Sequence, residues 1–508
     1  MNGNTRHAES FQTSPALRLV MFGIFIAAGL LITMSSVQLF DRYGVGLVTA
    51  IVVAIPIGVA IAWGAIPELI RNASSLRKHF GWQEWAWLFL FISAMTFEVR
   101  NLHEAMNNPL DSYVAIRAAS ELIVAIILAW RIASGKNSLQ YLFHGLPGFV
   151  ALYCLIAGIS TAWSIVPAWT FFKTAEYSLD VVTAAVIYDS ARTAEQYEQV
   201  LNWTWTIYAL ETAIPWVGAI ISPSTAWDEI GRLYSTMPMV GPNNIGTTGA
   251  VMTLVGVSRL LWRDRRGTSR AWYWAMIVYG VASMVASHTR HSFGGTLVGL
   301  IIILILARRK WIGVVLAGLS TPLLVFTSAG TTVTEYLRRG QSDEDLRGLT
   351  SRMDFWGYAW QQLVQHPLTG LGAYAGGRFG VLEKIGRAEA GSIHSDWVEI
   401  IMGTSFWGVL ALAPAVFGTL WYLCKGALSD LLKPLERDLA IECAGVMGLL
   451  TLHSFLNDEF VWHPPLLFLA VLGYAELIRR RLKAAEAASP AQRARSYEIN
   501  VPYAPAKG

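Results

Sequence analysis

The stretch RMDFWGYAWQQLVQ at residues 352–365 leads through HPLTGLG at 366–372 to IHSDW at 393–397, where a long apolar run begins. This polar segment lies between apolar runs of about 20 residues, each long enough to cross the hydrocarbon core of a bilayer as a helix. Long loops outside the membrane usually carry function in an otherwise compact bundle. The stretch therefore predicts a membrane protein whose functional residues lie in one long loop.

The first part of this segment predicts a short amphipathic helix. His366–Pro367 should end that helix, because proline disfavours the helical conformation of the residue before it. Glycines at 370, 372, 376 and 377 then predict a turn-rich stretch. The helical spacing of 352–365 places on one face Phe355, Tyr358, Ala359, Gln362 and Leu363.

The composition supports a membrane protein. Of 508 residues, 54% are hydrophobic and only 15% are charged, and the mean hydropathy is +0.42, which is too apolar for a soluble protein of this size. We expect an all-α fold, a polytopic membrane helix bundle of about 12–14 transmembrane helices with one long periplasmic loop. The apolar runs begin near Ala16, Val45, Trp82, Tyr113, Tyr141, Trp169, Leu201, Ile245, Ala271, Gly294, Trp311, Asp396, Asp438 and Pro464.

Lysine and arginine predict how the bundle is oriented, because cytoplasmic loops near the ends of spans are enriched in both. With the amino terminus inside, basic clusters fall in alternate loops, and only the loop around Arg192 is neutral to acidic. Both termini should therefore be cytoplasmic and the long loop periplasmic. The main basic clusters lie at 71–78, 131–136, 263–270, 308–310, 425–433 and 479–483.

This orientation divides the chain into four parts. Residues 1–328 are expected to form the amino-terminal transmembrane helices, and residues 329–395 the long periplasmic loop that carries part of the active site. Residues 396–482 should form the carboxy-terminal transmembrane helices, followed by a disordered cytoplasmic tail at 483–508. The run from Ala16 predicts a signal anchor rather than a cleaved signal peptide.

Several residues of the loop follow a known pattern. Arg352 is followed by Trp356, then by His366–Pro367 and the glycine-rich turn, and His394 stands where the next span begins. This region resembles the signature region of the bacterial O-antigen ligase and O-antigen or exopolysaccharide polymerase superfamily. Asparagine usually follows the last histidine in that family, and here the residue is Ser395.

Two earlier segments extend the resemblance. Arg290, preceded by Ser287-His288-Thr289, is similar to an arginine at the periplasmic end of an earlier span in that family. Arg232 and Pro242-Asn243 are similar to the arginine and Pro-Asn pair that precede a span in many members. The resemblance covers residues from about 230 to 410, and the amino-terminal half matches only in hydropathy.

The resemblance implies a glycosyltransferase of the bacterial inner membrane that passes a glycan from undecaprenyl diphosphate to an acceptor hydroxyl on the periplasmic side. It implies inverting displacement without a metal or another cofactor. The implied partners are the undecaprenyl diphosphate-linked donor, a glycan acceptor, membrane lipids, and the chain-length regulator and flippase of the same pathway. The balance of 39 basic and 35 acidic residues gives no reason to expect a nucleic acid.

Such a reaction needs cations that hold the diphosphate and a base that deprotonates the attacking hydroxyl. Arginine suits the first role because its planar fork binds phosphate oxygens bidentately. Histidine suits the second because it titrates near neutral pH. We therefore expect catalysis by His394, Arg352 and Arg290. Substrate binding is expected of Arg232, Asn243, Lys173 and Trp356.

These residues also have structural explanations. Arginines at the ends of spans often reach to the interface, and His394 precedes a helix start that its acidic first turn would stabilise by itself. Lys173 and Glu176 lie on one helix face, which favours a structural ion pair lining the cavity. His288 and His291 flank Arg290, but no third ligand is spaced with them as a metal site requires. A solvated turn is expected for the last periplasmic loop, which contains His453, Asp458, Glu459 and His463.

Three functions other than polymerisation stay open. A ligase would pass finished glycan to lipid A core or protein, whereas a polymerase passes a growing chain to the next carrier-linked repeat unit. The number of spans and the pattern of residues 352–408 favour a polymerase of exopolysaccharide or O-antigen. A polysaccharide or lipid-linked oligosaccharide transporter would be expected to show matched inverted repeats, which the sequence lacks. A scaffold would not need arginines and a histidine on one side.

Overall fold

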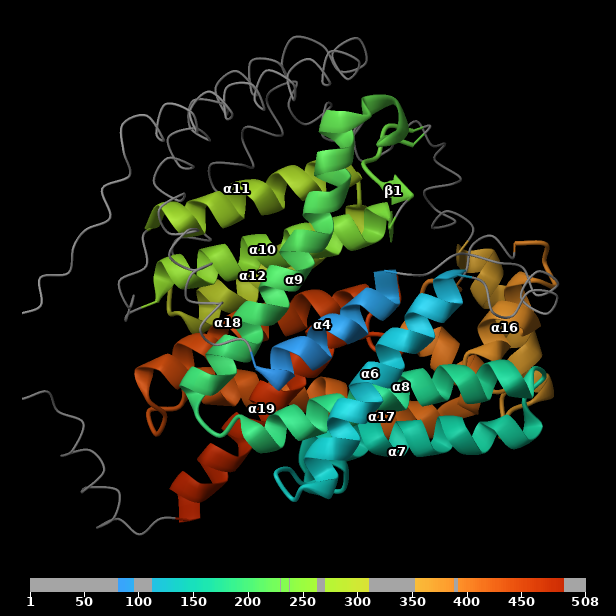
Figure 1. Cartoon of the computed structure of the whole chain (residues 1–508), viewed down its shortest axis with the longest axis horizontal. Helices are drawn as coiled ribbons and strands as arrows, with labels where there is room; N and C mark the ends of the chain where they lie inside the picture. The colour runs from blue at the N-terminus through green and yellow to red at the C-terminus, as the bar shows by residue number, and fades with distance from the viewer. Residues whose placement is uncertain are drawn as a thin grey trace, which may run out of the picture.

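The computed structural model describes residues 81–95, 112–228, 230–236, 238–262, 270–309, 352–387 and 392–487. This part of the chain is mostly helical (Figure 1), with one small antiparallel sheet of β1 (Ser235–Thr236) and β2 (Met239–Val240). The prediction of an all-α fold is therefore confirmed for the described residues.

The helices begin close to the predicted apolar runs, within seven residues in every case that the structure describes. The runs near Ala16, Val45 and Trp311 lie outside the described residues, as does the first part of the long loop. The helices are α4 (Trp82–Met95), α6 (Ser112–Ala133), α7 (Gly145–Ile159), α8 (Pro167–Ser190), α9 (Ala194–Ile221), α10 (Pro242–Leu261), α11 (Arg270–Ser287), α12 (Arg290–Leu306), α16 (Arg352–Gln365), α17 (Asp396–Leu428), α18 (Pro434–His453) and α19 (Leu466–Ala487).

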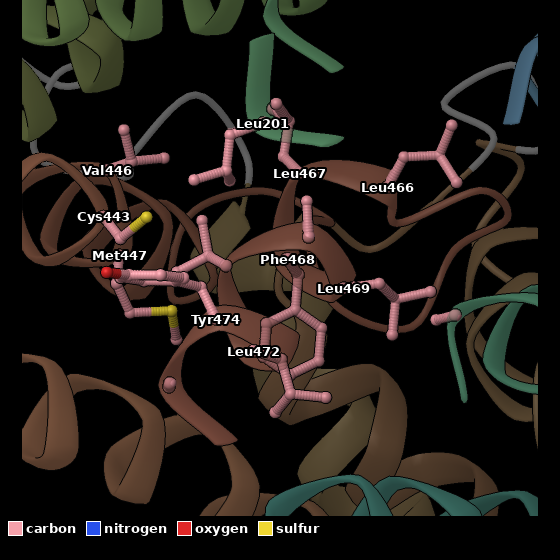
Figure 2. Close-up of a cluster of buried hydrophobic side chains, with 14 of the residues drawn as sticks. Leu201, Cys443, Val446, Met447, Leu466, Leu467, Phe468, Leu469, Leu472 and Tyr474 are labelled. Carbon is pink, nitrogen blue, oxygen red and sulfur yellow. The ribbon is translucent and has the colours of Figure 1, made fainter. Parts of the chain in front are cut away.

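Helix α19 lies at the centre of the bundle. Every residue from Leu466 to Ile478 is buried, and the helix contacts α7, α8, α9, α17 and α18. Figure 2 shows its side chains gathered with Leu201 of α9 and with Cys443, Val446 and Met447 of α18. Apart from Glu476, which pairs with Arg479, this stretch carries no charge on any side, as expected of a helix in the interior of a large bundle.

The described helices differ in how well each would cross a membrane alone. Two are long and apolar enough, Gly145–Trp163 and Asp396–Leu428, and α12 is apolar but shorter. Helix α8 is long, yet Lys173 and Glu176 are buried within it. Buried charges of this kind require partners in neighbouring helices before such a segment can enter a bilayer.

The long loop contains α16 with the predicted bounds. Phe355, Ala359 and Leu363 are buried on one face, while Tyr358 and Gln362 are half-buried. The glycine prediction holds in part. Positions 370 and 372 form a turn with φ of +65° and +97°, whereas positions 376 and 377 lie in a π-helical segment, Gly376–Leu382.

The glycine turn packs against a break in α17. Ser405 has φ of +56°, which interrupts the helix. The backbone N–H groups of Leu371 and Gly372 bond to the carbonyl oxygens of Met402 and Gly403 at 2.8 and 2.9 Å. A backbone carbonyl freed by a break inside a buried helix needs another donor. The N–H groups of the glycine turn provide these donors.

Candidate active site

The predicted catalytic residues all lie at or just before the start of a helix, and α16 is one of these helices (Figure 1). Arg290 is the first residue of α12 and Arg352 the first of α16. His394 lies two residues before α17. Burial lowers the pKa of Arg352, the carboxylate of Asp458 raises it, and the charge of Arg290 lowers it again. The two arginines and this carboxylate are therefore close enough for their charges to interact.

Asp396 fixes the start of α17 beside the loop that carries Asp458. Its carboxylate accepts hydrogen bonds from three consecutive backbone N–H groups, those of residues 459–461, at 2.8–3.3 Å. The Oγ of Ser395 caps the helix by accepting from the backbone N–H of Val398 at 3.5 Å. These contacts place His394 next to the loop that carries Asp458. In the sequence, α17 and α18 separate this loop from His394.

Trp356 ties α16 to the same place. Its indole Nε1 donates to the carbonyl oxygen of Ile393 at 3.1 Å, directly before His394. The indole N–H is therefore occupied by the backbone. A contribution of Trp356 to substrate binding stays a prediction, and its contact in the structure is one that positions His394.

His394 is held by Ser392, which is held in turn by Asp458. The backbone N–H of His394 and its ring Nδ1 both lie 3.3 Å from the Oγ of Ser392, and this hydroxyl donates to the Oδ2 of Asp458. A hydroxyl has one proton to donate, so Ser392 accepts from an Nδ1–H group. The proton of neutral His394 is thereby assigned to Nδ1, and Nε2 is left as the unprotonated nitrogen.

Burial, together with the charge of Arg352, keeps the ring of His394 neutral. Burial lowers the pKa of His394 to about 4, and the nearby charge of Arg352 lowers it too. Burial raises the pKa of Asp458 to about 6, although the hydrogen bond from Ser392 and the charge of Arg352 lower it. At pH 7 the histidine is therefore a proton acceptor, and the aspartate is mostly ionised.

The backbone of His394 has φ of +52°, a conformation that few residues other than glycine adopt. Such backbones persist where surrounding contacts outweigh the strain, and they cluster at functional sites. Here the bonds to Ser392 and the fixed start of α17 supply those contacts. The conformation aims the ring at Ser392 instead of along the helix that follows.

Arg290 is placed by a tight turn between α11 and α12. His288 has φ of +51°, and the Oγ1 of Thr289 donates to the carbonyl oxygen of Pro242 at 3.0 Å. This bond ties the start of α12 to the start of α10, so Asn243 lies at the same end of the bundle. Its predicted role in binding stays a prediction.

Arg232 makes a local ion pair. Its Nε lies 2.7 Å from the Oδ2 of Asp228, in the segment between α9 and α10. The next residue, Leu233, donates its N–H to the carbonyl oxygen of Ala286 at 2.8 Å, close to the turn before Arg290. Arg232 therefore lies at the same end, but its guanidinium already has a carboxylate partner.

Lys173 forms the predicted pair inside the bundle. Its Nζ lies 2.8 Å from the Oε2 of Glu176, whose other oxygen lies 2.5 Å from the Nε of Arg117. The Lys173 ammonium also lies 5.2 Å from the ring centre of Trp169. These contacts fit the structural explanation, and contact with substrate stays a prediction.

The prediction of a solvated turn after α18 is wrong. His453 is fully buried, with its Nδ1 3.1 Å from the Oε1 of Glu459, and the Nδ1 of His463 lies 2.7 Å from the Oδ2 of Asp180. Polar side chains in this loop find partners on other elements, which a local pattern cannot reveal. Asp458 was missed as a site residue for the same reason.

Part of the chain that includes the candidate active site is similar to a known protein family. Residues 274–413 match the family model described as O-antigen ligase. The matched region contains Arg290, Arg352, Trp356 and His394, and it leaves Asp458 outside. No curated protein matches the chain.

Proposed function

We propose that this chain, whose residues 274–413 match the family model described as O-antigen ligase, is a membrane glycosyltransferase that moves a glycan from undecaprenyl diphosphate to an acceptor hydroxyl. The proposed location is the inner membrane, with the bundle spanning it many times and the active site facing the periplasm. The observation that carries the proposal is the convergence of His394 with Arg290 and Arg352, two cations beside a neutral histidine.

The proposed reaction is a direct displacement. The Nε2 of His394 takes the proton of the acceptor hydroxyl while the oxygen attacks the anomeric carbon. The bond from that carbon to the diphosphate oxygen breaks, and Arg290 and Arg352 take up the charge of the leaving diphosphate. Attack opposite the leaving group inverts the anomeric centre, and no glycosyl enzyme forms.

The proton taken by His394 produces an imidazolium in a place where burial and Arg352 disfavour it. Asp458 offsets this cost, because its carboxylate accepts from Ser392 and so stabilises the Nδ1–H bond as the ring becomes charged. The bound diphosphate neutralises Arg352 in the same complex. His394 is therefore a stronger base with the donor in place than without it.

We propose polymerisation of exopolysaccharide or O-antigen repeat units as the specific activity. The test is purified protein in nanodiscs with a carrier-linked repeat unit, followed by analysis of the product on a gel. A ladder of chain lengths supports a polymerase, whereas transfer to added lipid A core and no ladder would assign a ligase. Movement of the donor across the bilayer without a new glycosidic bond would assign a transporter and overturn the proposal.

Replacing Ser392 with Ala is expected to lower kcat about tenfold, the effect of losing one hydrogen bond of about 1.4 kcal/mol. The substitution removes the link between Asp458 and His394 and leaves both titratable groups in place. The measurement is the initial rate at saturating donor and acceptor. Ser429→Ala, at the residue that directly follows α17, is the matched control. An unchanged kcat in Ser392→Ala would show that the link has no role in the rate.

The dependence of kcat/KM on pH is expected to show two steps. As pH falls through about 6, Asp458 gains a proton and no longer accepts from Ser392, so the rate falls by the factor seen in Ser392→Ala. As pH falls toward about 4, His394 gains a proton and the remaining rate is lost. The Ser392→Ala variant should lack the first step and keep the second. A single step near pH 7 in both proteins would contradict the assignment.

The orientation is testable at two described positions. An alkaline phosphatase fusion after Lys384, in the long loop, is expected to be active because the enzyme folds only when exported. A fusion after Lys136, in the basic segment that follows α6, is expected to be inactive. The opposite result would place His394 and both arginines in the cytoplasm.

A further inference from the structure

A groove lies far from the candidate active site, at the other end of the bundle. Just before α8 begins, the N–H of Ile165 bonds to the carbonyl oxygen of Leu371 in the glycine turn. After 24 residues of helix, about 36 Å at 1.5 Å per residue, Ser190 bonds to Asn137. The groove, about 370 Å³ in volume, is lined by Trp82, Ile126, Ile127, Trp130, Arg131 and Lys136.

Arg131 is fixed in place within this groove. Its Nε donates to the Oδ1 of Asn137 at 2.8 Å, and its guanidinium stacks 4.5 Å from the ring centre of Trp82. Asn137 is buried and donates to the Oγ of Ser190 at 2.6 Å. A guanidinium ordered in this way loses little freedom when it binds a ligand.

The basic residues of the groove lack the carboxylate partners found for other basic residues at this end. Arg259 pairs with Glu442 at 2.7 Å, and Arg479 pairs with Glu476 at 2.6 Å. Neither Arg131 nor Lys136 pairs with a carboxylate in the part of the chain that the structure describes. The carboxylate of Asp189 lies behind the groove, where it accepts from Asn137 and Ser138. Neither basic residue of the groove is therefore paired directly, which favours an anion.

An apolar ridge leads from the groove along α6. Leu122, Ile126 and Trp130 are 60%, 59% and 68% exposed, and their spacing of four residues aligns them on one face. A tryptophan beside basic residues is typical of the membrane interface, where the ring meets headgroups. The ridge is the surface against which an acyl chain would lie.

We propose that this groove binds an anionic glycerophospholipid. The phosphate lies between Arg131 and Lys136, where arginine supplies bidentate donors and lysine a point charge. Trp82 and Trp130 border the headgroup, and one acyl chain follows the ridge of α6. Binding is selective for a net negative headgroup, because a zwitterionic lipid brings its own cation to the same place. The bound lipid is separate from the glycan donor, whose diphosphate would lie at the other end of the bundle.

The test measures lipid binding by native mass spectrometry of the full chain released from detergent, titrated with phosphatidylglycerol or with phosphatidylcholine of the same acyl chains. The wild-type protein should bind phosphatidylglycerol more tightly. The double variant Arg131→Gln/Lys136→Gln should bind it about twenty- to thirtyfold more weakly, because each basic residue near an anionic headgroup contributes about fivefold. Lys136→Gln alone changes an exposed side chain, is expected to leave the fold intact, and should cost about fivefold.

The control is the double variant Arg192→Gln/Lys425→Gln, which removes two charges outside the groove, and it should bind phosphatidylglycerol as the wild type does. Inorganic phosphate should not displace the lipid, because phosphate has no acyl chain to contact the ridge of α6. Any one of four results would overturn the proposal. These are equal binding of both lipids, an unchanged affinity in Lys136→Gln, an equal loss of affinity in the control variant, and displacement of the lipid by phosphate. Glycosyl transfer plays no part in the readout, so the result does not depend on the proposed function.

Discussion

Replacing His394 with Ala is expected to lower the rate of glycan transfer by on the order of a hundredfold or more, the scale of losing a general base. The variant has no nitrogen to take the proton of the acceptor hydroxyl. Arg290 and Arg352 remain to hold the diphosphate, so binding of the carrier-linked donor should be largely unchanged. Purified variant in nanodiscs with carrier-linked donor provides both the initial rate and the donor affinity.

His144→Ala is the matched control for this experiment, because His144 is an exposed histidine just before α7 and lies outside the segments that resemble the family. It should transfer at the wild-type rate. A His394→Ala enzyme that turns over normally would show that the residue serves only to begin α17. A variant that no longer binds the donor would assign His394 to the diphosphate instead of the acceptor.

Replacing Arg352 with Lys is expected to remove most of the activity although the charge is kept. A lysine ammonium is a point cation and cannot reproduce the two parallel hydrogen bonds that a guanidinium makes to a diphosphate. Loss of one donor aimed at a developing negative charge costs on the order of a hundredfold in kcat. The same result is expected for Arg290→Lys, measured in the same assay together with the affinity for the donor.

Arg387→Lys provides the comparison, since Arg387 is an exposed arginine in the same loop and has no proposed role. It should keep full activity. If lysine supports the wild-type rate at both 290 and 352 in folded protein, the two arginines serve as interface anchors and the diphosphate is held elsewhere. A loss at position 352 alone would restrict the leaving-group role to that residue.

The two pairs of variants address opposite sides of the anomeric carbon. A loss in His394→Ala with donor binding retained supports action on the acceptor, and a loss in Arg352→Lys with weaker donor binding supports action on the leaving group. Ser392→Ala tests a third, indirect effect. The Ser392 side chain contacts neither substrate in the proposed reaction, and its loss changes only how His394 is held. Its smaller expected effect follows from that indirect position.

The sequence alone determined the features that depend on neighbouring residues. The spacing of residues 352–365 and the proline at 367 predicted the bounds of α16, because helical periodicity and proline geometry are local. The apolar runs predicted the helix starts for the same reason. Lys173 and Glu176 were predicted to pair because residues three positions apart on a helix lie side by side.

The candidate site could be predicted only in part. Arg290, Arg352 and His394 were identified through the family pattern, and the structure brings them to one end of the bundle. Asp458 and Ser392 carried no such signal, because their link joins two loops separated by α17 and α18. Nothing in the residues around Asp458 distinguishes a carboxylate held by Ser392 from one in water.

Only the tertiary structure decided which polar groups are buried and what they contact. The carboxylate of Asp396 could have capped its own helix, but it binds the backbone of residues 459–461 and so places Asp458 beside His394. The break at Ser405 became possible because the glycine turn supplies N–H groups to the freed carbonyls. Local sequence specifies helices, whereas the burial of a polar group depends on partners from distant segments, and these meet only when the bundle has formed.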